Sequence, residues 1–157
     1  MIASLDRIEV LILKKLLEDG RASYKAIAKE AQLTDVAIRK RVDSLKRRGI
    51  IKAIRAEINY EILGFEKPVY IQLRTEVSKT KDILKRIESF EHVLEIHQVL
   101  GEYNLLVKVV LPDLSAVKEF VERIGAIDGV LDMKTLIVLE EIKKTTTLPS
   151  SVMQKRF

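Results

Sequence analysis

The stretch TDVAIRKRVDSLKRRG, residues 34–49, decides how the first third of the chain folds. Six of its sixteen residues are Arg or Lys, yet Ile38, Val42 and Leu45 recur at helical spacing. At about 100° per residue these three share one face of a helix, and basic residues fill the opposite face. The stretch therefore predicts a helix with one side buried in a core and a cationic side turned outward.

Two more helices are expected before this one, separated by short breaks. Residues 6–19 (DRIEVLILKKLLED) carry an apolar stripe, and Asp6 with Glu9 three residues on has the pattern of a capping box. Residues 24–31 (YKAIAKEA) predict a short second helix, which Ser23 can cap. Three such helices in close succession predict a helix-turn-helix domain, in which the opening stretch is the third helix.

A segment with the period of a strand follows the three helices. From Ile50 to Ile58 (IIKAIRAEI) apolar and polar residues alternate, as they do in a strand or a small hairpin. Added to the helices, this segment predicts a winged helix-turn-helix. The next residues, NYEILGFEK, are typical of a short connector with one helical turn at residues 60–63.

The pattern changes from about residue 67, where strand and helix periods alternate. An internal repeat at a spacing of 37 residues supports this assignment, because the apolar residues of one predicted helix recur in the other. The corresponding residues are Ile83, Leu84, Ile87 and Phe90 in the first helix, and Phe120, Val121, Ile124 and Ile127 in the second. Two strand-helix-strand units of this kind predict a βαββαβ ferredoxin-like domain.

The expected fold class is therefore α+β, with an N-terminal winged helix-turn-helix followed by a C-terminal βαββαβ ferredoxin-like domain. The segments expected in the second half are a strand at 68–77, a helix at 80–90, strands at 93–99 and 103–111, a helix at 114–127 and a strand at 130–142. The expected boundaries are 1–50 for the helix-turn-helix domain, 51–66 for the wing strand and connector, 67–142 for the ferredoxin-like domain and 143–157 for a basic, flexible tail.

The charge of the chain is divided unevenly along its length. The net charge is +5, from 28 Lys plus Arg and 23 Asp plus Glu. Residues 1–58 carry +6, residues 59–142 carry −5 and residues 143–157 carry +4. A basic first part on an acidic body indicates a polyanion-binding end joined to a part with another task.

The outward face of the third helix is the candidate for polyanion binding. A solvated face is the ordinary explanation of a charge run, but this face holds a single acid, so ion pairs at i,i+4 cannot account for it. The third helix of a helix-turn-helix is free to enter the major groove of DNA, where Lys and Arg displace counterions and Arg39 or Lys40 can reach base edges. The residues expected to contact DNA are Ser23, Thr34, Val36, Arg39, Lys40, Asp43, Ser44 and Arg47.

One such module binds DNA weakly by itself. Two modules held about 34 Å apart in a dimer would read neighbouring major-groove faces of a palindromic operator in double-stranded DNA. The second half of the chain is the expected dimerising part, so the expected partners are DNA and a second copy of the chain. A competing interpretation is a nonspecific chromatin-type or RNA-binding protein with the same fold, which the basic tail favours slightly.

Enzyme chemistry has little support in the sequence. The two histidines, His92 and His97, lie near Glu91 and Glu95 in the sequence. Glu95 and His97 point to one face of a predicted strand and could share a metal ion, yet no third ligand follows at suitable spacing. The motifs of hydrolase elbows, zinc proteases, P-loops and dinucleotide folds do not occur. We therefore expect no catalytic residue, metal or cofactor. A decarboxylase of tetrapyrrole synthesis with this overall fold is the remaining enzyme alternative, and bound haem would reveal it by colour.

The composition also bears on the location of the protein. The 157 residues are 47% hydrophobic and 32% charged and include no cysteine, which excludes disulfides and thiolate metal sites. No apolar run approaches the roughly 20 residues of a membrane span, and the first residues lack the pattern of a secretory signal. We expect a cytoplasmic, nucleoid-associated protein without a membrane partner.

The order of these residues resembles the Lrp/AsnC regulators, also called feast/famine regulatory proteins. The matching pieces are Leu5-Asp6, Ile12-Leu13, Leu16, Asp19-Gly20-Arg21, Ile27-Ala28, Leu33, Arg41-Val42, Leu45, Gly49-Ile50-Ile51 and Leu63-Gly64, with VLGEYNLLVKV at 99–109 in the second half. The resemblance covers residues 5–149. It implies a sequence-specific transcriptional regulator that dimerises through an ACT-like effector and assembly domain, with dimers assembling into octamers or other rings.

The resemblance also implies a ligand site. In this family a small ligand, usually an amino acid, lies between dimers near a loop that reads Gly-Asp-aromatic-Asp. Asn104 replaces the final acid here, which removes a charge that would face the ammonium group of a ligand. The alternative to a ligand-binding loop is a tight turn that only joins the two repeats. Gln32 stands where the family usually has glycine, which eases a left-handed backbone, so the turn is expected to be slightly strained or differently shaped. The implied effector-binding residues are Leu100, Gly101, Glu102, Tyr103, Asn104 and Thr135.

Overall fold

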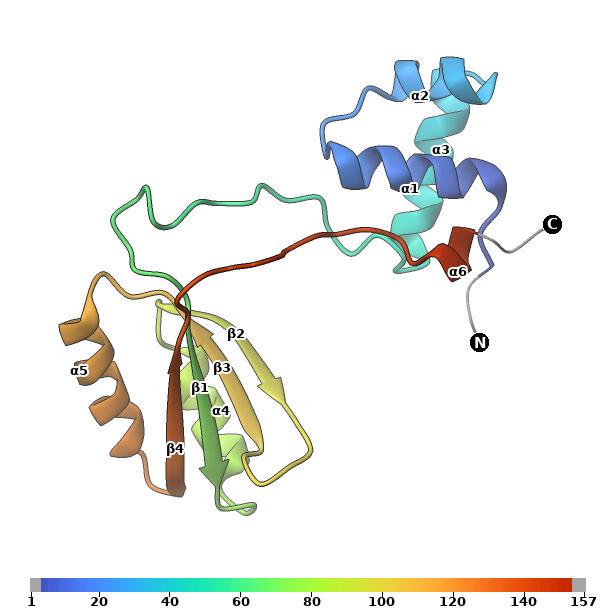
Figure 1. The fold of residues 1–157 in the computed structure, drawn as a ribbon. Helices are drawn as coiled ribbons and strands as arrows, with labels where there is room; N and C mark the ends of the chain where they lie inside the picture. Colours follow the sequence, from blue (N-terminus) through green and yellow to red (C-terminus); the bar gives the residue numbers. More distant parts are fainter. Residues whose placement is uncertain (1–3, 154–157) are drawn as a thin grey trace. The chain divides into compact units, whose positions relative to one another are not determined.

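A computed structural model of the chain describes residues 4–153, and Figure 1 shows it as a ribbon. The chain divides into two compact units. The first, called the head below, comprises the residues up to Glu57 together with the segment from Lys143 onward, and the second, called the sheet domain, comprises Ile58–Ile142. Each unit has a hydrophobic core of its own. No helix in the described part of the chain has the length and apolarity needed to cross a bilayer.

The head is built from three helices, α1 (Arg7–Glu18), α2 (Tyr24–Ala31) and α3 (Asp35–Arg47). The predicted capping box of α1 is confirmed, because the Glu9 N–H donates to the Asp6 side chain at 2.8 Å and the Asp6 N–H donates to the Glu9 carboxylate at 3.1 Å. These bonds satisfy two of the N–H groups involved in starting the helix. The residues of the head core are Ile12, Leu13, Ile27, Ala28, Ile38, Val42 and Leu45.

The predicted wing strand is not formed in this chain, which corrects the expectation for residues 50–58. Residues 52–59 are exposed and have no regular secondary structure, and the one sheet of the described residues includes none of them. Alternation of apolar and polar residues suits a strand, but a strand also needs a hydrogen-bonded partner, and none is present in the described chain. The predicted turn after it does form, where the Leu63 N–H donates to the Tyr60 carbonyl at 3.1 Å.

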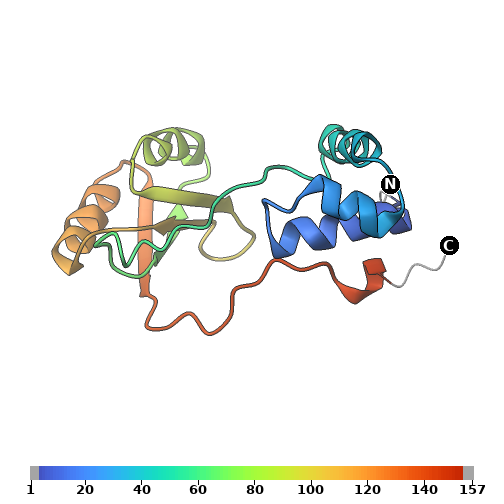
Figure 2. The ribbon, with the colours of Figure 1, turned by 90° about the horizontal axis from the view of Figure 1, so that it is seen from above.

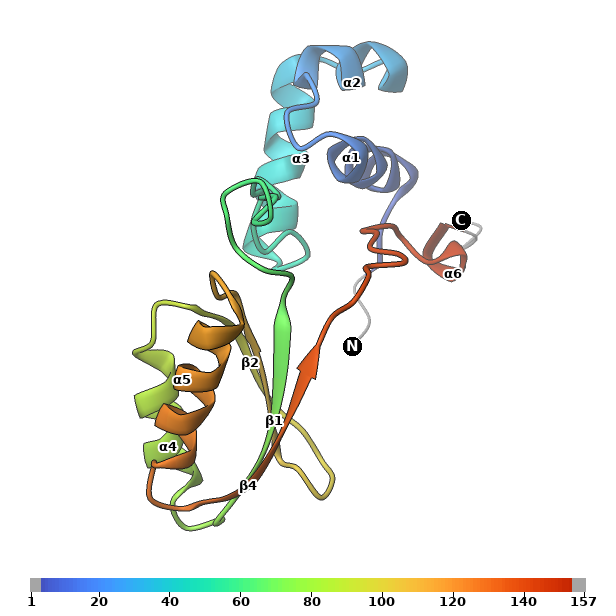
Figure 3. The same ribbon diagram turned by 60° about the vertical axis from the view of Figure 1, so that its left-hand side comes forward.

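The sheet domain has the predicted βαββαβ order. Its elements are β1 (Val69–Thr75), α4 (Thr80–Glu88), β2 (Val93–Gln98), β3 (Leu105–Val109), α5 (Leu114–Gly125) and β4 (Val130–Ile137). The four strands form one antiparallel sheet in the order β2-β3-β1-β4. Helices α4 and α5 cover the same face of this sheet (Figure 3). The arrangement is the ferredoxin-like sandwich expected from the repeat.

Both helices of the sheet domain pack on the sheet through their repeat residues. Four of these residues are buried in the core, namely Ile83, Ile87, Phe120 and Ile124, and the other four, Leu84, Phe90, Val121 and Ile127, pack against it partly buried. The rings of Phe90 and Phe120 meet edge to face, with 5.4 Å between their centroids. The two halves of the sequence repeat therefore share a single core.

Within the described sheet domain, the other face of the sheet carries no helix. Tyr70 on β1 pairs with Lys108 on β3 and with Leu136 on β4. Because side chains alternate along a strand, these three point away from the helix-covered face, where Ile71 is fully buried. Leu136 is 49% exposed. The open face thus mixes aromatic, aliphatic and charged side chains.

The C-terminal segment, predicted to be a flexible tail, returns to the helices of the head (Figure 2). Leu148 packs partly buried against the head core, and a short helix, α6 (Ser150–Met153), follows it. Nζ of Lys144 lies 2.6 Å from a carboxylate oxygen of Glu57. These contacts tie the described part of the tail to the head, whereas residues 154–157 of the predicted tail lie outside the described residues.

Candidate nucleic-acid interface

A tight turn joins α2 to α3 and fixes where α3 begins. Gln32 has φ 56° and ψ 41°, and it is the one non-glycine residue with a positive φ in the described chain. Of the two outcomes expected for this turn, a slight strain or a different shape, the structure has the first: the backbone of Gln32 is left-handed, which costs a side-chain-bearing residue about 1–2 kcal/mol. Thr34 then caps α3 by accepting the Ala37 N–H at 3.2 Å, and Gly49, with φ 71°, follows its C-terminus.

The core face of α3 is the one predicted from the helical wheel. Ile38, Val42 and Leu45 are 0%, 1% and 0% exposed, and all three belong to the head core. Val36, on the opposite side, is 60% exposed. The helix therefore has one side fixed in the protein and one side open to solvent.

The residues predicted to contact DNA lie off the core face. All are exposed except Ser44, which is partly buried. Val36, Lys40, Asp43 and Arg47 follow one another at intervals of four, three and four residues, which places them in one strip along α3. Ser23 caps α2, as predicted, by accepting the Ala26 N–H at 3.4 Å. The exposed members of the set are Ser23, Thr34, Val36, Arg39, Lys40, Asp43 and Arg47.

Two of the arginines after Ile38 are bound to the rest of the head. The Arg41 guanidinium donates to the Asp6 carboxylate, while Arg48 donates to Glu9 and, at 2.7 Å, to the Ser4 carbonyl. Partial burial raises the pKa of Asp6, but the Glu9 N–H and the Arg41 guanidinium outweigh it, so the net shift of that pKa is downward. Arg41 and Arg48 thus hold α3 against α1.

The remaining cations of α3 are turned outward. Lys40, Lys46 and Arg47 are exposed and have no ion-pair partner among residues 4–153. Arg39 is also exposed, with Nη2 3.5 Å from a carboxylate oxygen of Asp35. Since ion pairs within the described chain do not neutralise Lys40, Lys46 and Arg47, the outward face of α3 carries a local positive potential suited to phosphates.

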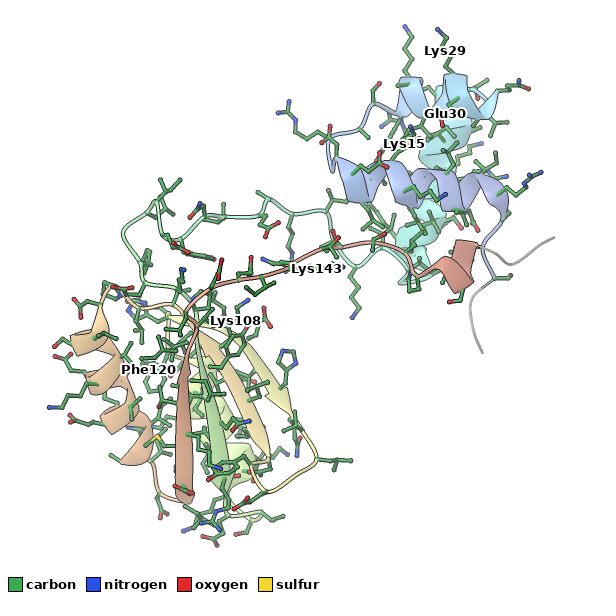
Figure 4. The ribbon with its side chains drawn as sticks, viewed as in Figure 1. Lys15, Lys29, Glu30, Lys108, Phe120 and Lys143 are labelled. Atoms are coloured by element: carbon green, nitrogen blue, oxygen red, sulfur yellow. The ribbon has the colours of Figure 1, made fainter. Side chains whose placement is uncertain are left out.

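Helix α2 contributes a further cation next to this region. Lys29 projects outward from α2, as Figure 4 shows. Its neighbour Glu30 is instead paired with Lys15 of α1, at 2.9 Å, and this hydrogen bond raises the pKa of Lys15. The pair Lys15–Glu30 links two helices, whereas Lys29 remains exposed.

One residue beside the outward face was missed in the sequence. Tyr24 is the first residue of α2, and its ring centroid lies 5.4 Å from Cζ of Arg39 on α3. An aromatic side chain at the start of the second helix was the available signal. Which side chain of α3 it meets depends on how the two helices cross, which the sequence does not specify.

The loop predicted to bind an effector joins β2 to β3. Residues 100–102 are exposed and Tyr103 is partly buried. The Tyr103 hydroxyl donates to the Asp132 carboxylate at 2.7 Å, which raises the pKa of Tyr103 and lowers that of Asp132. Nζ of Lys134 lies 4.4 Å from the Tyr103 ring centroid. Thr135, on the same strand as Asp132, is exposed.

Asn104, the last residue of this loop, directs its side chain into the sheet domain. Its Oδ1 accepts the Thr75 N–H at 2.9 Å and its Nδ2 donates to the Thr75 hydroxyl at 2.7 Å. The Thr80 hydroxyl donates to the Glu76 carbonyl at 3.0 Å, so the 2.8 Å contact between the two hydroxyls has Thr75 as its donor. The Thr75 oxygen therefore needs the donor that an asparagine, but not an ionised acid, provides.

A hollow in the sheet domain lies elsewhere. It has a volume of about 570 Å³, and its lining includes Phe65, Val69, Val117 and Leu139. Nζ of Lys67 donates to the Leu139 carbonyl at 2.6 Å beside it. None of the six implied effector residues lines this hollow. The predicted effector loop therefore does not line this hollow, and its residues 100–102 are exposed.

The two histidines considered as metal ligands each lie near one carboxylate. Nε2 of His97 is 3.2 Å from Glu95, and Nε2 of His92 is 3.7 Å from Glu91. Within residues 4–153 no group of three or more His, Asp or Glu side chains could hold a metal ion. The hydrogen bond from His97 is the largest cause that lowers the pKa of Glu95. These pairs are surface contacts with two ligands at most.

Comparison with known proteins matches both units. The sequence of residues 5–46 matches the protein family described as the AsnC-type helix-turn-helix domain, and residues 68–148 match the family described as the Lrp/AsnC ligand binding domain. The HTH-type transcriptional regulator FL11 of Pyrococcus abyssi is 32% identical over 149 residues, covering 95% of this chain and 99% of that protein. The HTH-type transcriptional regulator Ptr1 of Methanocaldococcus jannaschii is 31% identical over 146 residues, covering 92% and 99%.

Solved structures resemble the whole chain as well. AsnC of E. coli has a TM-score of 0.86 and 26% identity, covering 94% of this chain and 100% of that one. A transcriptional regulator of Neisseria meningitidis, solved as a complex with L-Met, has a TM-score of 0.87 and 25% identity, covering 96% and 99%.

Proposed function

This chain belongs to the Lrp/AsnC family of HTH-type transcriptional regulators, and from that premise we propose that it binds a palindromic operator in double-stranded DNA through the outer strip of α3. The observation that carries the proposal is the two-sided character of this helix. Its core face is buried, while its outward cations Lys40, Lys46 and Arg47 have no ion-pair partner among residues 4–153. Such a helix can enter a major groove without disturbing the core of its domain.

The outward side chains of α3 suit different kinds of DNA contact. Lys40 and Arg47 suit phosphate contacts, which supply affinity and make it depend on salt. Arg39 has a planar guanidinium that can bind O6 and N7 of guanine together, a contact worth about 1–3 kcal/mol against the wrong base. Val36, which is 60% exposed, can pack against a thymine methyl group. Ser23 and Thr34 contribute polar contacts at the helix starts.

The regulator acts as a dimer or a larger assembly in this proposal. Two heads held about 34 Å apart would engage the two half-sites of a palindrome. Residues 52–59 support dimerisation, because they are exposed and belong to no strand of the described sheet, while their alternating pattern suits a strand that a second copy could complete. The open face of the sheet, with Tyr70 and Leu136, offers a second contact area. Octamers or other rings of dimers are the larger assemblies we propose.

We assign modulation by a small molecule, such as an amino acid, to the loop of residues 100–104 with Thr135. The Neisseria meningitidis relative, solved with L-Met, supports this class of ligand. Asn104 is engaged with Thr75, so the carboxylates available near the loop are those of Glu102 and of Asp132, which Tyr103 already contacts. A ligand ammonium group would compete with Tyr103 for Asp132. An assembly of several copies would enclose the exposed loop.

Competition footprinting tests the proposed function. The full chain should protect a discrete palindromic site in genomic fragments in the presence of excess nonspecific DNA, and the test should be repeated with a panel of amino acids. Uniform coverage that excess nonspecific DNA abolishes would instead favour the chromatin-type or RNA-binding alternative. We propose no enzymatic activity, and we place the protein at the nucleoid in the cytoplasm, where an operator is accessible.

A further inference from the structure

Arg39 differs from the other outward cations of α3 in having an aromatic support on another helix. Its Cζ lies 5.4 Å from the centroid of the Tyr24 ring, and Nη2 lies 3.5 Å from Asp35. Tyr24 begins α2 and Asp35 begins α3, so the three side chains join both helices of the helix-turn-helix. Lys40, one residue on, has neither an aromatic nor a carboxylate partner in the described chain.

The Tyr24 ring is held firmly enough to act as a support. It is partly buried and packs against the head core, whose nearest members in sequence, Ile27 and Ala28, are 2% and 4% exposed. A tyrosine has two side-chain torsions, so packing fixes its ring at a small cost in entropy. The Arg39 side chain, by contrast, is 62% exposed, and Asp35 is its one ion-pair partner among the described residues.

The geometry leaves the hydrogen-bond donors of Arg39 available. A guanidinium near the face of an aromatic ring is attracted by the ring quadrupole, an interaction that does not pair its five N–H groups with acceptors as a carboxylate does. The contact with Asp35 is long, at 3.5 Å, and involves one terminal nitrogen. Arg41 is the opposite case, because its donors are bound to the Asp6 carboxylate. The chain thus immobilises Arg39 without consuming most of its donors.

We infer that Tyr24 is a positioning residue, whose ring holds the Arg39 guanidinium where its N–H groups can meet DNA. Tyr24 then raises operator affinity through Arg39 rather than through a DNA contact of its own. A free arginine loses side-chain entropy when DNA immobilises it, and an arginine already held by a ring loses less. This inference rests on the proposed function, since it assumes that Arg39 contacts DNA.

A double-mutant cycle tests the inference with the full-length protein and a DNA fragment that the wild type selects from a random-sequence library. Tyr24→Leu should weaken binding by about 3- to 10-fold, as expected for the loss of one cation–π contact and its pre-organisation. In the Arg39→Ala background the same change should have no further effect. Tyr24→Phe keeps the ring and should bind like the wild type, which separates the ring face from the hydroxyl group.

An equal loss from Tyr24→Leu in both backgrounds would overturn the inference, because Tyr24 would then act independently of Arg39. So would full affinity in the Tyr24→Leu or the Arg39→Ala variant. Should Tyr24→Leu unfold the head, NMR of the free wild-type protein provides a second readout. The ring current of Tyr24 should shift the side-chain protons of Arg39 upfield, and ordinary shifts would refute the stacking. Failure of the wild type to select any DNA would instead refute the proposed function.

Discussion

Replacement of Asn104 by aspartate is predicted to destabilise the sheet domain, although the two side chains have nearly the same shape. Hydrogen bonds run in one direction from Asn104 Nδ2 to Thr75, from Thr75 to Thr80, and from Thr80 to the Glu76 carbonyl. Thr75 and Thr80 are 5% and 7% exposed, so water does not readily replace a lost partner. An ionised carboxylate has no proton to donate and would leave two oxygens facing each other without a hydrogen between them.

The expected loss of stability follows from this series of hydrogen bonds. Leaving one buried polar atom without its partner costs about 1–3 kcal/mol. Asn104→Asp should therefore speed amide exchange of β1 and β3 through local opening by about 5- to 150-fold near pH 7. Asn59→Asp is the matched control. Asn59 is exposed and only accepts a hydrogen bond, from the Ile62 N–H at 3.2 Å, so a carboxylate there should be nearly neutral.

The stability lost in the Asn104→Asp variant should also depend on pH. Burial and the missing donor disfavour the charged carboxyl, so its pKa in the folded variant lies above the usual value of about 3.9. Its protonated form can donate to Thr75, as Asn104 does in the wild type. The lost stability is therefore restored below about pH 3.9 and disappears again as the pH rises through the raised pKa.

Hydrogen exchange measured by mass spectrometry on β1 and β3 peptides of the full chain is the assay, with wild type and Asn59→Asp alongside. Exchange in the Asn104→Asp variant equal to wild type near pH 7 would refute the assigned direction of the hydrogen-bond chain. Faster exchange of the Asn104→Asp variant that persists below about pH 3.9 would also refute it, because the protonated carboxyl should then donate to Thr75 as the amide does.

Four substitutions in the head test its packing and the backbone of its turn. Leu45→Ala should lower the free energy of unfolding of the head by about 2–5 kcal/mol, because Leu45 is 0% exposed. Val36→Ala, at a site 60% exposed, should change this free energy by less than about 0.5 kcal/mol. Equal effects of the two substitutions in a denaturant titration would contradict the assigned core and outward faces of α3. Gln32→Gly should stabilise the head by about 1 kcal/mol, since glycine adopts φ 56° without strain, and a lowered melting temperature would refute this. Leu148→Ala should accelerate amide exchange in the head helices, and exchange like that of the wild type would mean that the tail contributes no stability.

Much of this fold was readable from the sequence because its signals are local. The capping box of Asp6 and Glu9, the caps Ser23 and Thr34, and the helical spacing of Ile38 and its partners each involve residues a few positions apart. The repeat added information over a longer range, because the same apolar pattern occurs twice and packs into one core. These features depend on periodicity and hydrogen bonding along the chain, which the sequence states directly.

The features that the sequence did not give involve residues far apart in the chain or in separate copies. The strand expected at residues 50–58 has the right alternation, but no strand partner for it exists in the described chain. Leu148 reaches a core formed by residues more than a hundred positions earlier, and no pattern near it indicates that partner. The contact between Tyr24 and Arg39 depends on the crossing of two helices. The role of Asn104 depends on two hydroxyl protons whose direction only the assembled network defines.

The salt dependence of operator binding tests the central claim most directly, with Lys40→Ala and Arg47→Ala compared against Lys81→Ala, an exposed cation on α4. If the outer strip of α3 lies against DNA, each α3 variant should bind more weakly and lower the slope of log affinity against log salt by about 0.9 for each lost phosphate contact. Lys81→Ala should leave both the affinity and the slope unchanged. Wild-type affinity and slope in the Lys40→Ala and Arg47→Ala variants would contradict the claim that this helix enters the groove.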